Sequence, residues 1–252
     1  MAAPLQDTHL QDRVVVVTGA GGSLGSRTVA TMAAAGAHVV ATGRTESSIR
    51  EAVVGLERAR AVTCDITDEA STQALVDECL AQHGRIDVLV NNAAITEPGD
   101  AMSSTTGSFR RVLETNVVAT FTLSRQVGAG MVERGAGSII NVGSIFGGKG
   151  VADAATGYAV SKAAVHGLTL QLAAQWGRAG VRVNAIAPGP FASGLNDHFE
   201  DPGEADFWGH RTAMGRVAQP EEFDELMRFL AGDGSSYVTG AVIPIDGGWA
   251  SV

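Results

Sequence analysis

Tyr158 and Lys162 are the two residues of this sequence best suited to moving a proton together. They are four residues apart in a stretch with a helical pattern, so their side chains project from the same face. The pKa of an ordinary tyrosine is about 10, and a nearby ammonium favours the phenolate and lowers that pKa. The spacing therefore predicts an acid/base group. The alternative is a solvated lysine that lies over the tyrosine ring.

The position of Ser144 gives this pair a context. Ser144 lies fourteen residues before Tyr158, just beyond an apolar run that ends at Val142, and Tyr158 is one of only two tyrosines. Open α/β sheets bind their ligands at the carboxyl ends of strands. We therefore expect Ser144 and Tyr158 to share a site, although a serine at this position could also serve only a turn.

A glycine-rich turn follows the first apolar run and leads into a helical stretch. Its residues are Thr18-Gly19-Ala20-Gly21-Gly22-Ser23-Leu24-Gly25. Glycines let the backbone approach a pyrophosphate closely, and the start of the following helix attracts negative charge. The strict Gly-x-Gly-x-x-Gly pattern fails, because Leu24 occupies the third glycine position. Taken alone, the turn indicates a phosphate cradle only weakly against ordinary turn chemistry.

The elements that must position these residues alternate between strands and helices. Short, continuous apolar runs suit strands buried on both faces of a sheet. The predicted strands are 14–17, 38–41, 61–64, 88–90, 138–142, 181–186 and 241–245, and the predicted helices are 24–35, 69–82, 109–134 and 154–176. This order predicts the α/β class, with a parallel sheet covered by helices on both faces and a single domain over residues 1–252.

Composition and charge limit the partners. The chain has 27 acidic and 18 basic residues, a net charge of −9 without a basic cluster, which disfavours nucleic acid and anionic membranes as partners. Cys64 and Cys79 lack metal-ligand spacing and form no disulfide framework, so we expect no metal site and a reduced, cytoplasmic compartment. Residues 1–13 lack a signal-peptide core, and no apolar run is long enough to span a membrane.

The segment 189–215 breaks the alternation of strands and helices. It carries several glycines and prolines, with Phe199, Phe207 and Trp208 among polar residues. Loops of this length in compact domains are often functional, and this one follows a core strand. We interpret it as a substrate lid; an irregular surface excursion is the alternative. Together with Ile145 and Phe146, it would determine substrate specificity.

The motifs together resemble the short-chain dehydrogenase/reductase family over residues 10 to 249. They are Thr18-Gly19-x-x-x-Ser23-x-Gly25, Asn91-Asn92-Ala93-Ala94, Ser144, Tyr158-x-x-x-Lys162, Pro188-Gly189 and Thr239-Gly240-x-x-x-x-x-Asp246-Gly247-Gly248. Four positions depart from the family pattern: Ser23 and Ala94 stand where glycine is usual, Gly143 replaces the first of a common serine pair, and Ser193 replaces threonine. Of these, Ser23 must accept a backbone geometry that glycine accepts more easily. The resemblance implies a Rossmann-like, doubly wound fold.

The same resemblance implies a reaction and its catalytic residues. Tyr158 would protonate a carbonyl oxygen as hydride arrives from a nicotinamide, and Ser144 would hydrogen-bond that oxygen. Lys162 would also bind the nicotinamide ribose, and Asn116 would hold a water of the proton relay. The alternatives are a turn serine at Ser144 and, at Asn116, a polar residue that bends its helix. The substrate would be a small-molecule ketone or secondary alcohol.

The resemblance also assigns residues to the cofactor. Asn92 would approach the adenosine ribose, Pro188 and Gly189 would line the nicotinamide side, and the backbone near Phe191 would meet the carboxamide. Asp65 would bind the adenine amino group; a helix N-cap is its alternative role, for which Thr67 is better placed. The complete expected set is Gly19, Ser23, Leu24, Gly25, Arg44, Asp65, Ile66, Asn92, Ala93, Tyr158, Lys162, Pro188, Gly189 and Phe191.

The end of the second strand favours NADP(H) over NAD(H). A carboxylate there would bind the NAD ribose and repel a 2'-phosphate, but the residues are Thr42, Gly43 and Arg44. A guanidinium suits phosphate. NAD stays possible, because Arg44 could be solvated or stack on adenine, and because Gly22 stands where family members of this type often carry a basic residue.

Three further expectations complete the sequence analysis. The helix that carries Tyr158 is apolar on several faces, which together with the resemblance predicts a homotetramer. There are two alternative functions: an NAD-dependent alcohol or sugar dehydrogenase of the same family, and a nucleotide-binding regulator without turnover. A sugar-nucleotide epimerase would need a larger substrate domain than this chain offers.

Overall fold

Seven parallel strands form one sheet with the order β3-β2-β1-β4-β5-β6-β7. The computed structural model describes residues 10–152, 154–192 and 202–251. The strands are β1 (Val14–Thr18), β2 (His38–Gly43), β3 (Ala59–Thr63), β4 (Val88–Asn91), β5 (Gly137–Val142), β6 (Val181–Pro188) and β7 (Val242–Ile245). The strand order reverses between β1 and β4, where open sheets of this kind bind ligands.

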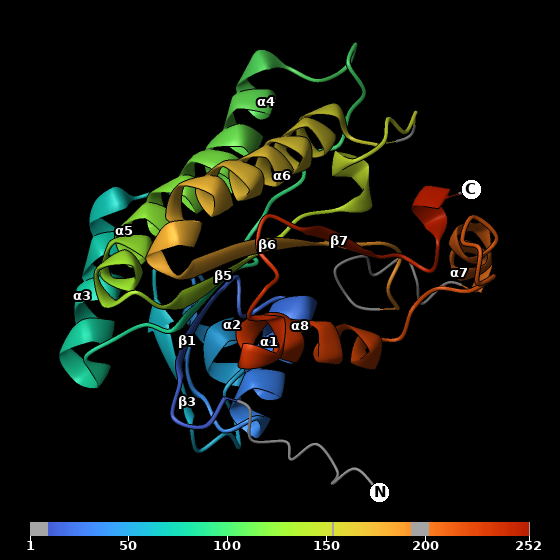
Figure 1. Cartoon of the computed structure of the whole chain (residues 1–252). Coiled ribbons are helices and arrows are strands. Elements are labelled where there is room, and N and C mark those ends of the chain that lie inside the picture. Colours follow the sequence, from blue (N-terminus) through green and yellow to red (C-terminus); the bar gives the residue numbers. More distant parts are fainter. Residues whose placement is uncertain (1–9, 153, 193–201, 252) are drawn as a thin grey trace, which may run out of the picture.

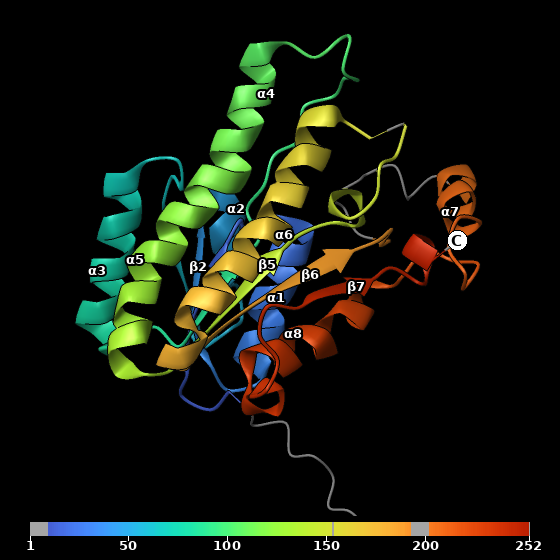
Figure 2. The same ribbon diagram turned by 45° about the horizontal axis from the view of Figure 1, so that its top comes forward.

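Helices cover both faces of the sheet, as the sequence predicts (Figure 1). One face carries α1 (Ser23–Ala34), α2 (Glu46–Glu51) and α8 (Asp224–Ala231), and the other carries α3 (Glu69–His83), α4 (Thr106–Leu113), α5 (Ala119–Arg134) and α6 (Thr156–Trp176). In both views α7 (Pro202–Gly209) stands apart, beyond the carboxyl end of β6 (Figure 2). The molecule is a single α/β domain with a Rossmann-like fold.

The valine run of β1 shows why continuous apolar runs become strands here. Val15 and Val17 pack into the core beneath α1 and α8, whereas Val16 packs into the core beneath α3, α5 and α6. Successive side chains of a strand point to opposite faces, so a strand buried on both faces needs an apolar residue at every position. This burial fixes the position of each strand in the sheet. It thereby fixes the carboxyl edge of the sheet, where the site lies.

A buried chain of amides and hydroxyls joins the sheet to α5 and α6. Asn91 donates from Nδ2 to Ser124 Oγ at 2.9 Å and to Asn141 Oδ1 at 2.8 Å, and Asn141 Nδ2 donates to Thr169 Oγ1 at 2.9 Å. Buried polar groups are stable only when they are paired in this way. These bonds fix α6, which carries Tyr158, against the carboxyl halves of β4 and β5.

The helix predicted over 109–134 is divided in the structure. Between α4 and α5 lies a π-helical turn (Glu114–Val118), in which Asn116 is buried. The Asn116 side chain accepts a bond from Ile95 N and donates one to Ile95 O. The main-chain carbonyl oxygen of Asn116 accepts a bond from Thr120 Oγ1. Such turns often occur at functional sites. Apolar periodicity carries no signal for one extra residue per turn, so the sequence could not show it.

Several element predictions differ from the structure. Strand β3 begins two residues before the predicted run at Ala61, and α2 and α8 were not predicted. Both missed helices are short, which gives periodicity little to detect. The segment 189–215, predicted as irregular, contains α7, and Ser193 and Phe199 lie outside the described residues. Within the described part of the chain no helix is long and apolar enough to cross a membrane.

Candidate active site

Tyr158 and Ser144 meet at the carboxyl end of β5. Ser144 begins a short 3-10 helix (Ile145–Gly147), where its Oγ accepts a hydrogen bond from Phe146 N at 3.2 Å. Its hydroxyl also lies close enough to the phenol of Tyr158, in the first turn of α6, to favour the phenolate. The structure therefore brings together the two residues that the sequence predicted to share a site.

Lys162 lies one turn further along α6 and is 3% exposed. Its Nζ is 5.4 Å from the centroid of the Tyr158 ring and donates to the carbonyl oxygen of Val142 at 2.6 Å. The ammonium is thus held at the end of β5, on the same side as the phenol. Its long side chain reaches the backbone of the sheet, which helical spacing alone could not indicate.

The pKa of Tyr158 differs from the expectation. Burial raises this pKa above its ordinary value, and the neighbouring Ser144 hydroxyl lowers it only in part. We predicted a lowering by Lys162, and that prediction was wrong for this structure. The reason is that burial of the phenol outweighs the other influences on it. Burial also lowers the pKa of Lys162 to about 8, and its Nζ donates to Val142 O.

Asn116 is bonded to α6 through Ser161. Its Nδ2 donates to Ser161 Oγ at 2.9 Å and to Ile95 O at 2.9 Å, and Ser161 lies between Tyr158 and Lys162 on α6. The side chain is therefore fully used in joining the π-helical turn to α6 and to the segment after β4. Asn116 is thus bonded to the helix that carries Tyr158, and its predicted role in holding a water of the proton relay stays a prediction.

The glycine-rich turn is compact because side chains there would collide with the end of β4. Gly19 has a φ of +64°, and a Cβ on it would lie 2.7 Å from Ala93 Cα. A Cβ on Gly25 would lie 2.1 Å from Gly19 O. Asn92 Nδ2 donates to Thr18 O and Gly19 O, at 3.0 Å and 3.1 Å. These contacts fix the glycine-rich turn against the end of β4, at the strand reversal.

Ser23 does not carry the strain that its replacement of a glycine suggested. It is the first residue of α1, with Gly22 as N-cap, and the one described non-glycine residue with positive φ is Asp12. The helical start needs no left-handed conformation at Ser23. Leu24, the position that fails the strict motif, is buried in the core instead of facing the turn.

A cleft of about 310 Å³ opens at the strand reversal, beside the start of α1. Five of its lining residues were predicted from the sequence: Gly19, Arg44, Ile66, Asn92 and Ala93. Its other lining residues are Gly21, Gly22, Gly43, Thr45, Ser48, Ile49, Cys64, Ala94, Ile95 and Thr115. Six of these lie within four residues after a strand end, which is the signal that could have found them. The glycine-lined floor and the helix start suit a dinucleotide.

Asp65 is not among the residues that line this cleft, although its neighbours Cys64 and Ile66 are. Its Oδ1 accepts bonds from Thr67 N at 3.0 Å and Thr67 Oγ1 at 2.7 Å, and these bonds lower the pKa of Asp65, with a smaller contribution from Arg44. The N-cap of α3 is Asp68, which accepts from Ala70 N, so neither Asp65 nor Thr67 fills the cap role considered from the sequence.

Pro188 is the last residue of β6, and Gly189 and Phe191 follow it. A Cβ on Gly189 would lie 2.7 Å from Asp246 Cα, so the C-terminal Asp246 turn packs directly on this backbone. Phe191 pairs with Ala218 as a parallel bridge, and its ring packs on Phe223 at 5.8 Å. The ring therefore belongs to the core, while the pairing pattern turns the Phe191 amide away from Ala218.

Aromatic side chains from three segments gather near Ser144. Phe146 contacts Trp208 of α7 at 6.2 Å and Trp249 near the C-terminus at 5.9 Å, measured between ring centroids. Phe146 was expected to affect specificity, whereas Trp249 was not identified from the sequence. Of the specificity residues proposed, Ile145 is buried. Within the described residues no group of His, Cys, Asp or Glu side chains is arranged to hold a metal.

Comparisons with known proteins agree with this arrangement. A family model described as enoyl-(acyl carrier protein) reductase matches residues 19–250. The chain is 38% identical to galactitol 2-dehydrogenase (L-tagatose-forming) from Cereibacter sphaeroides, covering 96% of both chains. It is 37% identical to cis-4-hydroxycyclohexanecarboxylate dehydrogenase from Sinomonas cyclohexanicum, covering 96% of this chain and 98% of the relative.

A solved structure is similar over almost the whole chain. Gluconate 5-dehydrogenase from Burkholderia cenocepacia, in complex with NADP and tartrate, superposes with a TM-score of 0.89 at 31% identity and covers 98% of both chains. Sequence similarity and fold therefore extend across the strand reversal and the Tyr158 helix alike. The chain belongs to the short-chain dehydrogenase/reductase family and is an NAD(P)-dependent oxidoreductase that acts on CH–OH groups.

Proposed function

We propose that this protein interconverts a ketone and a secondary alcohol with NADP(H), using Tyr158 as the acid/base. The observation that carries the proposal is the placement of Ser144 beside the Tyr158 phenol at the end of β5, with the buried Lys162 one turn away. This arrangement lies at the sheet edge where the cleft at the strand reversal also opens.

The proton steps follow from these contacts. When bound, the nicotinamide supplies or accepts the hydride. In reduction, the neutral Tyr158 phenol donates its proton to the carbonyl oxygen, and Ser144 hydrogen-bonds the same oxygen and orients it. In oxidation, the phenolate of Tyr158, which the Lys162 ammonium stabilises, takes the hydroxyl proton and becomes the neutral phenol. Asn116 holds the π-helical turn against Ser161 and keeps α6 in place.

The cofactor residues other than Arg44 form three groups. Gly19, Ser23, Leu24 and Gly25, in the turn and at the start of α1, would serve the phosphates, and of these Gly19 lines the cleft. Asp65, Ile66, Asn92 and Ala93 would serve the adenosine, although the Asn92 amide is engaged by the glycine turn and Asp65 by Thr67. Pro188, Gly189 and the Phe191 amide would meet the nicotinamide together with Lys162 and Tyr158.

The preference for NADP(H) rests on Arg44. Arg44 is exposed and lines the cleft together with Thr45 and Ser48, which start α2. A guanidinium and two hydroxyls at this edge suit a 2'-phosphate, and β2 ends without a carboxylate that would repel one. The similar gluconate 5-dehydrogenase holds NADP, which supports the same choice here.

The substrate class is proposed from the relatives and from the aromatic cluster. Two relatives are named for galactitol and for cis-4-hydroxycyclohexanecarboxylate, both of which carry hydroxyl groups. We infer a small hydroxylated or cyclic substrate, with the segment 189–215 as its lid. The contact between Trp208 and Phe146 supports this role, because it joins α7 to the loop that carries Ser144.

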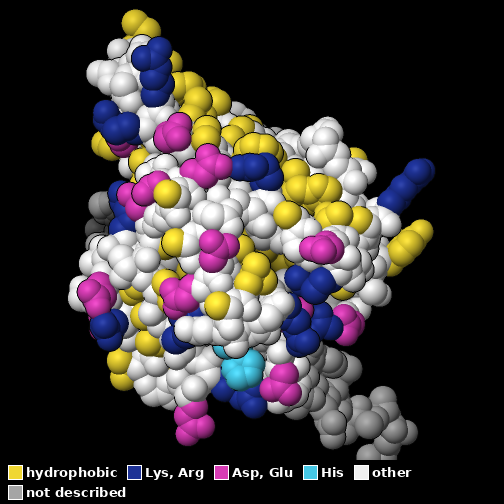
Figure 3. All heavy atoms as spheres, turned by 90° about the vertical axis from the view of Figure 1, so that its left-hand side faces the viewer, with side chains coloured by type: hydrophobic (Ala, Val, Ile, Leu, Met, Phe, Trp, Pro, Cys, Tyr) yellow, Lys and Arg dark blue, Asp and Glu magenta, His cyan; other side chains and the backbone are white. Residues whose placement is uncertain are grey.

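The assembly and the compartment are also proposals. Exposed apolar side chains of α5, α6 and the π-helical turn, namely Val118, Phe121, Val160 and Leu170, support a homotetramer. A band of apolar side chains crosses the upper part of the face seen in Figure 3. Cys64 and Cys79 are buried and unpaired, which supports the reducing cytoplasm.

The test is a paired assay of the purified protein. NADPH and NADH are titrated separately by cofactor fluorescence, and each is then used to reduce a panel of hydroxylated, cyclic and open-chain ketones. We expect turnover of part of the panel and tighter binding of NADPH. Tight NADPH binding without turnover of any ketone or alcohol would instead favour a nucleotide-binding regulator, and a preference for NADH would overturn the cofactor assignment.

A further inference from the structure

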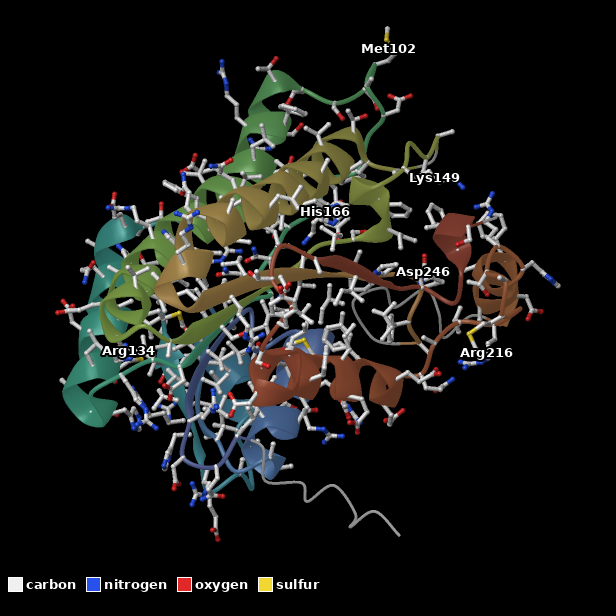
Figure 4. The ribbon with its side chains drawn as sticks, in the orientation of Figure 1. Met102, Arg134, Lys149, His166, Arg216 and Asp246 are labelled. Carbon is white, nitrogen blue, oxygen red and sulfur yellow. The ribbon has the colours of Figure 1, made fainter. Side chains whose placement is uncertain are left out.

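His166 lies one turn beyond Lys162 on α6 and has no part in the proton steps described above. Figure 4 shows it between α6 and the segment that follows β5. Its Nε2 is buried and has no hydrogen-bond partner among the described residues. A half-buried imidazole beside the catalytic lysine needs an explanation, because unpaired buried nitrogen atoms are costly.

The explanation lies in two glycines that flank Ser144. A Cβ on Gly143 would lie 2.4 Å from His166 Nε2 and 2.8 Å from its Cδ2. A Cβ on Gly147 would lie 2.7 Å from His166 Cε1. Neither glycine has a positive φ, so space and not backbone conformation excludes a side chain at both positions. At Gly143 the imidazole takes that space, and at Gly147 the imidazole shares it with the α6 backbone, since the Cβ would also lie 2.7 Å from Lys162 C and 2.8 Å from Ala163 N.

Helix α6 therefore holds the Ser144 segment at both ends. At one end, Lys162 Nζ bonds the carbonyl oxygen of Val142 at 2.6 Å. At the other, the imidazole of His166 fills the space between Gly143 and Gly147 and lies against both residues. Ser144, which must meet both Tyr158 and the substrate oxygen, lies between these two points of contact.

We infer that His166 is a positioning residue for Ser144, and that Gly143 is the residue that makes room for it. The inference rests on the proposed role of Ser144 and adds the element that sets its place. A displacement of about 1 Å at a reacting group can cost about a hundredfold in rate. Burial and the neighbouring Lys162 ammonium lower the pKa of His166, which keeps the ring neutral beside the lysine at pH 7.

A double-mutant cycle tests this coupling. Gly143→Ala, His166→Ala and the double variant are compared with wild type for kcat at saturating NADPH and ketone. Each single change is expected to lower kcat by about tenfold or more, because Ser144 moves. In the double variant the new methyl group occupies space vacated by the imidazole, and only Ile186 O at 3.1 Å still crowds it. Its kcat should therefore be no lower than that of His166→Ala alone.

Gly148→Ala is the matched control, because a Cβ there would lie 3.8 Å from its nearest neighbour. The Gly148→Ala variant should keep the wild-type kcat. The stoichiometry and affinity of NADPH binding should be unchanged in all four variants, and this readout distinguishes a misplaced Ser144 from a misfolded protein. Losses that multiply in the double variant, or a Gly143→Ala variant as active as Gly148→Ala, would overturn the inference. Ser144→Ala and Tyr158→Phe are measured in parallel: wild-type kcat in these would refute the proposed function itself.

Discussion

The pKa of the Tyr158 phenol is subject to opposing influences. Burial favours the neutral form, the Ser144 hydroxyl favours the phenolate, and the Lys162 ammonium is itself disfavoured by burial. A neutral phenol with a serine beside it is the arrangement that reduction needs at its start. Oxidation needs the phenolate, and therefore needs Lys162 to stay protonated.

Lys162 makes stability depend on pH in a defined direction. Its pKa falls from 10.5 to about 8 on folding, so the unfolded chain binds the proton more tightly between these values. Burying the ammonium therefore lowers the free energy of unfolding by on the order of 3 kcal/mol. This destabilisation is present in full below pH 8 and disappears as the pH rises toward 10.5. Thermal unfolding of Lys162→Met and wild type should therefore show the difference in Tm moving in favour of wild type from pH 7 to 10. Parallel curves would contradict this view of Lys162.

Arg44 is the residue on which cofactor choice depends in this account. Arg44→Ala should weaken NADPH binding by about tenfold to a hundredfold, because a hydrogen-bonded charge pair with the 2'-phosphate is lost, and should leave NADH binding almost unchanged. Arg50→Ala is the control, since Arg50 is exposed on α2 and pairs with Glu46. Equal losses of NADPH and NADH affinity in Arg44→Ala would show that the side chain serves the adenine instead.

At the residue scale, sequence spacing predicted which side chains meet but not how they bond. Four-residue spacing places Tyr158 and Lys162 on one face, and the strand end at Val142 places Ser144 nearby. The bond from Lys162 to Val142 depends on the reach of a flexible side chain, and the His166 contact depends on how close α6 lies to the strand-end loop. Both are properties of packing between elements that are distant in sequence.

The strand-to-helix connection after β1 is the element that shapes the cleft. Thr18 Oγ1 accepts bonds from the amides of Asn92 and Ala93, and Asn92 returns bonds to the turn, so the ends of β1 and β4 are joined at the strand reversal. Gly25 completes this packing, since its lack of a side chain lets α1 start directly above Gly19 O.

Gly25→Ala is expected to disturb that packing. The added Cβ would overlap Gly19 O and crowd Asn92 Nδ2, so Tm should fall and NADPH binding should weaken by at least about tenfold. Gly167→Ala in α6 is the control: nothing lies within 4 Å of its Cβ position, and alanine should raise stability by about 0.5–1 kcal/mol. Differential scanning calorimetry and cofactor titration measure both effects. Wild-type NADPH affinity in the Gly25→Ala variant would argue against a phosphate-binding role for the glycine-rich turn.

Elements with strong periodicity were predicted well from the sequence, and irregular ones were not. The valine run of β1 and the long apolar pattern of α6 each reflect burial that the sequence encodes locally. The π-helical turn at Asn116 is stabilised by bonds to Ile95 and Ser161, which only the folded chain brings together. The same holds for α7, whose Trp208 packs against Phe146 from another segment.

At the scale of the whole molecule, α6 has two sides with different tasks. Its inner side carries Tyr158, Lys162 and His166 toward the sheet, while Val160 and Leu170 remain exposed. Apolar side chains of this size exposed together on neighbouring helices favour contact with another subunit. Assembly would then stiffen the helix that carries the catalytic groups.

Leu170→Glu tests this assembly. Leu170 is 54% exposed, so the charge is tolerated in an isolated subunit but is buried in the proposed tetramer, where it should reduce the assembly to smaller species. Leu80→Glu on α3, at 38% exposure, is the control and should leave the assembly intact. Sedimentation velocity reads both outcomes. A wild-type protein that sediments as a monomer at micromolar concentration would contradict the tetramer.

Single-turnover oxidation of bound NADPH by a ketone substrate, compared between wild type and Tyr158→Phe, tests the central claim most directly. The phenylalanine keeps the ring over Lys162 and removes only the hydroxyl beside Ser144. The account predicts unchanged NADPH affinity and a hydride-transfer rate lower by at least about a hundredfold, the usual contribution of a general acid. A Tyr158→Phe variant that oxidises NADPH at the wild-type rate would contradict it.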